Sequence, residues 1–301
     1  MSTLRKSQRA NRKRHAQLIV VLLLALALKL CYATASPNEL RWILAPTTFL
    51  VELLSGVSFQ FESHAGYITS DHSFIIAASC AGVNFLITSF LMLSLSKLWS
   101  ARSQNRSHNP LHSLTWRFIP VAAVFAYVAT LVANTIRIST ALRLQRLPLE
   151  TSWLNRNQLH RFEGIFIYFG FLLLLFILSE KMSSRNASSS KNLSGSLSAS
   201  RLFRQSFFPL LIYYSTTLGI PLANGAYRQG IEFWEHSLFV LLTPLLLILP
   251  LVTSHLFSQI KQHKSACWDQ GAQICRLKRG AESHPRSANI SIKPRSTSQA
   301  K

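Results

Sequence analysis

Three side chains of complementary chemistry lie at or near the edges of long apolar segments: the thiol of Cys80, the guanidinium of Arg137 and the imidazole of His160. A thiolate is a strong nucleophile, an imidazole can move protons, and a guanidinium stays charged and can hold developing negative charge. An apolar setting disfavours the thiolate, so a nearby cation must stabilise it. This set of side chains has the composition of a catalytic site in which Cys80 is the nucleophile.

Three neighbouring residues extend this candidate site. Asn134 lies three positions before Arg137, which places both on one helix face, where Asn134 could hold substrate amides or orient the guanidinium. Gly82 would let a peptide backbone approach closely, and Asn84, at position i+4 from Cys80, could also face the site.

Each of these residues also has an ordinary structural interpretation. A cysteine in a membrane helix commonly packs as a small apolar residue, an arginine at a helix end extends to lipid headgroups, and an interfacial histidine anchors the helix. Other histidines would also lie on the outer side and compete with His160 as the base: His64, His72 and His236.

The elements that must position these residues are apolar helices. About 20 residues of helix cross the hydrocarbon core of a bilayer. Six segments are long enough, or nearly so, and lie near 17–35, 74–96, 114–136, 164–179, 207–226 and 236–257. With 49% hydrophobic and 14% charged residues, the composition agrees with a membrane protein. The fold class we predict is an all-α integral membrane protein with about six transmembrane helices.

The distribution of basic residues predicts the orientation of these helices. The net charge is +21, and 24 of the 32 Lys and Arg residues lie in 1–16, 97–117, 181–204 and the tail after 258. These stretches share one side if the six segments are the only crossings, so that side is cytoplasmic by the positive-inside rule. The charge is therefore a topology signal, and we expect lipid rather than nucleic acid as its partner.

The segment Leu40–Leu54 is apolar but contains Arg41, Pro46 and Glu52. If it crossed the membrane, the basic loops would fall on opposite sides, so we predict an interfacial or re-entrant helix on the outer face. Alternating residues at 57–61 and a possible return strand at 67–69 predict a short hairpin, with a plain loop as the alternative.

The predicted organisation has five parts. They are a basic cytoplasmic N-terminus at 1–16, a membrane catalytic core at 17–180, a Ser-rich cytoplasmic linker at 181–206, a helical hairpin at 207–257 and a basic, disordered cytoplasmic tail at 258–301. The first apolar run is expected to be a retained helix, with a signal peptide as the alternative, because 33–35 is only a weak cleavage site.

The cysteine spacing indicates neither a metal site nor a disulfide framework, and no cofactor is predicted. Besides Cys80, the chain has Cys31 in the first helix and Cys267 and Cys275 in the basic tail.

With the predicted topology, Cys80, Arg137 and His160 reach the outer leaflet from three successive helices. They stand two turns into the second helix, at the end of the third and at the start of the fourth.

At these residues the sequence resembles the exosortase/archaeosortase family of membrane-embedded cysteine transpeptidases, over roughly residues 20–180. The family pattern is a Cys followed by small residues including Gly, an Arg at the end of a following helix and a His opening the next. It matches Cys80 with Gly82, Arg137, and His160 with Gly164. Ala81 departs from it, since family members more often have Ser there.

The resemblance implies a cysteine peptidase of the bacterial inner membrane whose active site faces the periplasm. It would recognise exported proteins by a C-terminal signal of motif, membrane helix and basic cluster, cleave near the motif through a thioester and transfer the new C-terminus to an envelope acceptor. Two other functions remain open from the residues alone: a small transporter, and a non-catalytic scaffold of an exopolysaccharide-export system.

Overall fold

The computed structural model describes residues 2–104, 116–146, 156–185, 199–231, 233–250 and 253, and this part of the chain is mostly helical. The helices are α1 (Ser2–Thr34), α2 (Arg41–Ser55), α3 (Val83–Gln104), α4 (Phe118–Arg146), α5 (Arg156–Arg185), α6 (Ala199–Tyr214), α7 (Ile220–Ala223) and a last helix at Phe233–Pro250. The strands are β1 (Phe59–Glu62), β2 (Gly66–Thr69) and β3 (Ile75–Ile76), and the short helical turns are η1 (Ala78–Ala81), η2 (Ser215–Gly219) and η3 (Ala226–Gln229).

The chain forms a multi-pass membrane protein. In the described part, five helical segments are long and apolar enough to cross a bilayer: Asn11–Thr34, Ala78–Trp99, Phe118–Gln145, Gln158–Met182 and Phe233–Pro250. They correspond to five of the six predicted crossings, which confirms a mostly helical membrane fold. The remaining one, predicted at 207–226, is an apolar helix of 17 residues, Phe207–Ala223, interrupted by the π-helical turn η2.

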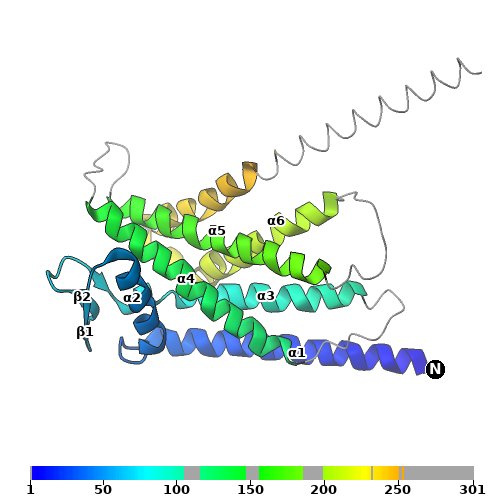
Figure 1. Ribbon diagram of the computed structural model, residues 1–301. Helices are drawn as coiled ribbons and strands as arrows, with labels where there is room; N and C mark the ends of the chain where they lie inside the picture. Colours follow the sequence, from blue (N-terminus) through cyan, green and yellow to red (C-terminus); the bar gives the residue numbers. More distant parts are fainter. Residues whose placement is uncertain are drawn as a thin grey trace, which may run out of the picture. The chain divides into compact units, whose positions relative to one another are not determined.

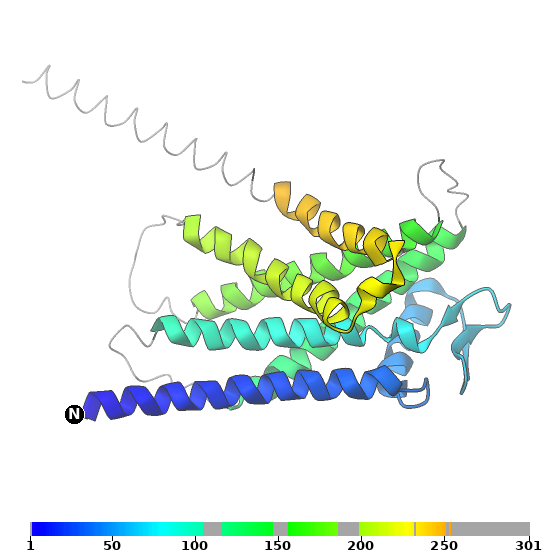
Figure 2. The same ribbon diagram turned by 180° about the vertical axis from the view of Figure 1, so that it is seen from behind.

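Consecutive long helices run in alternating directions, so the helical bundle has two distinct ends (Figures 1 and 2). The start of α1, the end of α3, the start of α4 and the end of α5 lie at one end. The other end carries α2 and the three strands, and we call it the sheet end. This alternation is the arrangement expected for helices that cross a membrane in turn.

The N-terminal basic segment belongs to the first helix. Because α1 begins at Ser2 and continues to Thr34, residues 2–16 are helical rather than a flexible extension. Of the predicted Ser-rich linker at 181–206, residues 186–198 lie outside the described part of the chain, as does the whole tail at 258–301.

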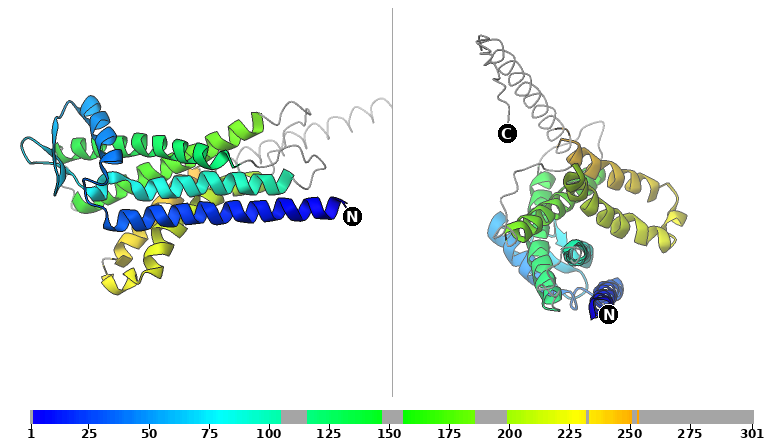
Figure 3. Two further views of the ribbon diagram at one scale, coloured as in Figure 1. Left: turned by 90° about the horizontal axis from the view of Figure 1, so that it is seen from below. Right: turned by 90° about the vertical axis from the view of Figure 1, so that its right-hand side faces the viewer.

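A helix and a hairpin are present at the sheet end in the segments where they were predicted, and α2 crosses the helices of the bundle (Figure 3). β1 and β2 pair antiparallel, with Phe59 opposite Thr69, and a third strand, β3, which the sequence pattern missed, pairs with β2. The charged residues of this segment, Arg41 and Glu52, attach α2 to the hairpin. The Glu52 carboxylate accepts a hydrogen bond of 2.7 Å from the backbone N–H of Phe59, and the Arg41 guanidinium lies 4.6 Å from the centre of the Phe61 ring.

Two apolar cores hold the bundle together. The first lies among α1, α2, α3 and α4, and the second joins α3, α4 and α5 to α6 and the last helix. Many large apolar side chains remain exposed, for example Leu23, Val124 and Leu246, as expected for helices whose outer faces contact lipid. The sheet end is thereby attached to a rigid bundle, and the candidate site lies where the two meet.

Candidate functional site

Cys80 lies within the apolar span Ala78–Trp99 but not in an α-helix, which corrects the sequence-based expectation. It belongs to the 3₁₀ turn η1, in which its backbone N–H donates to the carbonyl of Ala77 at 2.8 Å, and α3 begins only at Val83. β3 occupies part of the segment predicted to be the first two turns of the helix. Cys80 therefore stands in the turn just before the N-terminus of α3.

Gly82 makes the junction between this turn and α3 possible. Its φ of +73° is in the left-handed region that favours glycine. A Cβ at this position would lie 3.2 Å from Cγ of Asn134 and 3.3 Å from the Tyr168 hydroxyl. Gly82 is thus required for the backbone conformation and for the close approach of α4 and α5 to the cysteine turn.

A chain of two hydrogen bonds fixes the backbone at Cys80. The buried Asn134 side chain donates from Nδ2 to the carbonyl oxygen of Cys80 at 2.7 Å, and its Oδ1 accepts from the Tyr168 hydroxyl at 2.8 Å. The Tyr168 ring is itself stacked on Phe85 of α3, with ring centres 4.9 Å apart. Three helices therefore determine where the thiol stands, and Asn134 contributes through the backbone of Cys80.

Arg137 brings its charge to the thiol from the same face of α4. Its guanidinium lies near enough to Cys80 to interact with it electrostatically, and it lies 5.3 Å from the centre of the Tyr168 ring. A Cβ added to Gly164 would lie 3.6 Å from Cδ of Arg137, so this glycine gives the arginine room beside α5. Nε of Arg137 is buried and has no hydrogen-bond partner among the described residues.

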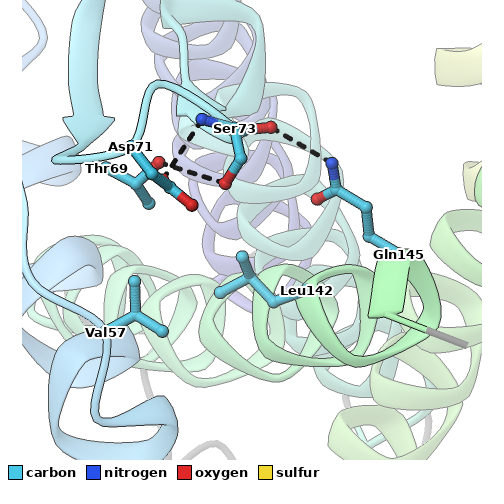
Figure 4. A pocket seen from close by; sticks show the side chains of 6 residues that line it. All are labelled: Val57, Thr69, Asp71, Ser73, Leu142 and Gln145. Carbon is cyan, nitrogen blue, oxygen red and sulfur yellow. Dashed lines mark hydrogen bonds between the residues drawn. The ribbon is translucent and has the colours of Figure 1, made fainter.

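Arg137 is not at a helix end, contrary to the expectation from sequence. α4 continues to Arg146, and Asn134 and Arg137 lie more than two turns before its C-terminus. The extension has a structural task, because Nε2 of Gln145 donates to the carbonyl of Ser73 at 3.1 Å and so ties α4 to the loop before β3 (Figure 4).

This loop forms one side of a pocket of about 240 Å³ with Leu142 and Gln145 of α4 opposite (Figure 4). Within the loop, hydrogen bonds from Thr69 and from Ser73 lower the pKa of the exposed Asp71 to about 2. The carboxylate is therefore ionised at neutral pH, and its bonds hold the segment that leads into the cysteine turn.

His160 lies in the second turn of α5, as predicted for the start of the fourth crossing, and its side chain is half exposed. Its Nδ1 is 3.3 Å from Oε2 of Glu163, a carboxylate whose side chain is only 7% exposed. Among the described residues, no hydrogen bond or ion pair joins His160 to Cys80. Gly164, one turn after His160 on the same helix, is the position that packs against Arg137.

The structure thus brings together four of the six predicted residues, Cys80, Gly82, Asn134 and Arg137, whereas His160 lies on α5 one turn before Gly164, the residue that packs against Arg137. Asn84 points elsewhere: its Oδ1 accepts a hydrogen bond of 2.8 Å from Lys29 of α1. The i+4 relation to Cys80 does not hold, because the left-handed conformation at Gly82 separates the turn from the helix.

Three residues of the site were missed by sequence reasoning. Tyr168 holds Asn134, Glu163 contacts His160, and Tyr32 of α1 interacts electrostatically with both Cys80 and Arg137. The first two had a readable signal, because Gly164 and Tyr168 are one turn apart on α5 and Glu163 is the one acid near the start of that helix. Nothing in the sequence connects Tyr32 with Cys80.

A second pocket, of about 150 Å³, lies beside the site between α1, α2 and the start of α3. Tyr32 and Val83 line it together with apolar residues such as Leu40. No group of His, Cys, Asp or Glu residues with the arrangement of a metal site occurs in the part of the chain that the structure describes.

Comparison with protein-family models, with curated proteins and with solved structures finds no match for this chain. The chemistry of the site therefore rests on its own side chains: a thiol just before a helix start, a guanidinium near it, and a histidine–carboxylate pair in the second turn of α5.

Proposed function

We propose that this protein is a membrane cysteine peptidase that acts as a transpeptidase. The observation that carries the proposal is that Asn134 and Tyr168 fix the backbone of Cys80 by hydrogen bonds, while the Arg137 guanidinium, one turn from Asn134 on α4, lies near enough to Cys80 to interact with it electrostatically. A guanidinium stabilises the thiolate and, later, the oxyanion that forms on a substrate carbonyl. A cysteine that merely packs needs neither a charged donor nor a fixed carbonyl.

The proposed reaction has two steps. The Cys80 thiolate attacks the scissile carbonyl carbon, a C–S bond forms, and Arg137 holds the charge on the tetrahedral oxyanion. Collapse breaks the C–N bond, and the leaving amine takes a proton from protonated His160. The amine or hydroxyl of an acceptor then attacks the thioester and loses its proton to His160, and breaking of the C–S bond frees Cys80.

The proposed substrates are exported proteins that carry a C-terminal sorting signal consisting of a motif, a membrane helix and a basic cluster. This substrate class comes from the resemblance to the exosortase/archaeosortase family. In the proposed orientation the protein lies in a bacterial inner membrane with the sheet end in the periplasm, where such a signal would present its motif. Limited access of water to the thioester would favour transfer to an acceptor over hydrolysis.

The decisive experiment follows the maturation of a co-expressed exported protein with such a C-terminal signal. Cys80→Ala should abolish the size shift that marks cleavage. A variant in which Cys31, Cys267 and Cys275 are all replaced by Ser, but Cys80 is kept, should mature the substrate normally. Full maturation by Cys80→Ala would refute the peptidase and leave the transporter or the scaffold as the function.

A further inference from the structure

The sheet that precedes the cysteine turn has two edge strands, β1 and β3, because β2 lies between them. In an antiparallel pair, successive residues direct their main-chain groups alternately towards the neighbouring strand and away from it. The N–H of Thr69 donates to the carbonyl of Phe74 at 3.1 Å, so Phe74 faces β2. Ile75, the next residue, lies opposite Ile68 and therefore directs its N–H and C=O away from β2, to the outer edge of the sheet.

Ala77 extends this outer edge towards the thiol. Ile76 pairs with Tyr67 of β2, and Ala77 continues in an extended conformation, with φ −77° and ψ 172°. By the same alternation, the N–H of Ala77 points to the outer edge, while its C=O accepts the hydrogen bond from the N–H of Cys80. Within the described part of the chain, the outward main-chain groups of Ile75 and the N–H of Ala77 have no hydrogen-bond partner.

The two edges of the sheet differ. At β1, the outward N–H of Phe59 donates to the Glu52 carboxylate of α2, so that edge is partly covered. Among the described elements, only β2 and η1 pack extensively against β3. Ile75 is 47% exposed, and Cys80 is itself partly exposed. An open edge is the surface to which an extended peptide can add as a further strand.

We infer that β3 is the docking edge for the substrate, whose segment next to the scissile bond binds in an extended conformation through main-chain hydrogen bonds to Ile75 and Ala77. Only Ala78 and Ser79 separate Ala77 from the nucleophile, so a strand paired along β3 leads its following residues towards the thiol. The inference rests on the proposed function and deepens it, because it states the conformation in which the substrate binds.

The first test removes one edge donor without disturbing the fold. Ala77→Pro suits the backbone, since φ is already −77°, Ile76 before it is extended, and the lost N–H bonds to nothing in the described protein. We expect an unchanged melting temperature in detergent and maturation slowed by roughly two- to tenfold, the net effect of one hydrogen bond. Ala77→Ser keeps the N–H and should mature the substrate at the wild-type rate. A stable Ala77→Pro protein of wild-type rate overturns the inference.

The second test does not depend on the stability of the proline variant. Ile75→Cys is placed in the Cys80→Ser protein, with the other three cysteines replaced by Ser. It is co-expressed with substrates whose single cysteine moves residue by residue through the segment before the mapped cleavage site. Because alternate residues of a strand share one face, oxidation should form disulfides at every second substrate position.

The opposite edge provides the matched control. Gln60 of β1 and Ile75 of β3 both lie opposite Ile68, so their side chains are on the same face of the sheet. Gln60 stands two strand spacings away, about 10 Å, which is beyond the reach of a disulfide to a peptide paired with β3. Gln60→Cys should therefore give no disulfide to the substrate.

Three cross-linking results overturn the inference: no disulfide to the substrate, disulfides at every third or fourth position as in a helix, or disulfides only between two Ile75→Cys chains. The last would assign the edge to a second copy of the protein. All three leave the peptidase intact if the wild-type protein matures the substrate and Cys80→Ala does not. Maturation by Cys80→Ala would refute the peptidase, and the inference with it.

Discussion

At the scale of single residues, the proposed mechanism makes the role of Arg137 depend on the shape of its side chain as well as on its charge. Lysine carries the same charge as a compact ammonium group without the planar fork of donors. We therefore expect Arg137→Lys to insert and fold but to lose activity by about 10²–10³-fold, the usual cost of removing one oxyanion donor. Arg143→Lys, at an exposed position on the same helix, serves as the control and should mature the substrate normally.

Near-normal maturation by the lysine variant would mean that any cation suffices next to the thiol. In that case Arg137 would act only on the thiolate, and stabilisation of the oxyanion would have to come from another donor.

Gly82 provides a second test on this scale. Gly82→Ala forces a side chain into the left-handed region, which costs about 1–3 kcal/mol, and pushes it against Asn134 and Tyr168. We expect a lower melting temperature in detergent and a loss of maturation. Gly170→Ala, on α5 with no atom within 4 Å of the added Cβ, should be as stable as wild type or more so. Equal behaviour of the two variants would contradict the close packing described around the cysteine turn.

At the scale of elements, α2 is attached to the sheet by the bond between Glu52 and the Phe59 N–H. Hydrogen bonds to charged groups contribute about 1.5–3 kcal/mol, so Glu52→Ala should loosen the hairpin. Proteolysis of the membrane-bound protein, followed by mapping of the cleavage sites, should show faster cutting within residues 59–69. Glu62→Ala, whose side chain contacts only the exposed His64 among the described residues, should not accelerate cutting.

The same elements show what the sequence could and could not predict. Apolar runs of about 20 residues and the alternation at 57–61 were sufficient for the long helices, for α2 and for the β1–β2 hairpin. The start of α3 was predicted wrongly because residues 74–82 are as apolar as a helix. The helix instead begins at Val83, because the left-handed backbone of Gly82 and the pairing of β3 with β2 interrupt the apolar segment before it. Both features depend on contacts with distant segments.

The candidate site, too, could be predicted from the sequence only in part. Cys80, Arg137 and His160 were predicted from residue type, and the i, i+3 spacing of Asn134 and Arg137 predicted that both lie on one side of α4, the side that faces Cys80 in the structure. Tyr32 and Tyr168 could not be assigned, because an aromatic residue in an apolar helix looks like any other core residue until its neighbours on other helices are known.

At the scale of the whole molecule, the alternating helix directions and the distribution of basic residues lead to a topology prediction. Reporter fusions at Ser107 and Ser190 should be cytoplasmic, and fusions at Ser63 and Glu150 should be periplasmic, because the positive-inside rule places the basic loops inside. Alkaline phosphatase and green fluorescent protein fusions give opposite signals for the two sides. A cytoplasmic Ser63 would place the sheet end and Cys80 on the wrong side for an exported substrate.

The hydrogen bond from Asn134 reaches the main chain of Cys80 and not its sulfur. Replacing the thiol by a hydroxyl therefore leaves this hydrogen bond intact. The Cys80→Ser protein should keep the structure around residue 80 while losing its reactivity. Such a variant is suited to substrate trapping, because it would bind its substrate without cleaving it. Photo-crosslinking from Tyr32 or Val83, which line the adjacent apolar pocket, could then retrieve the natural client from the living cell.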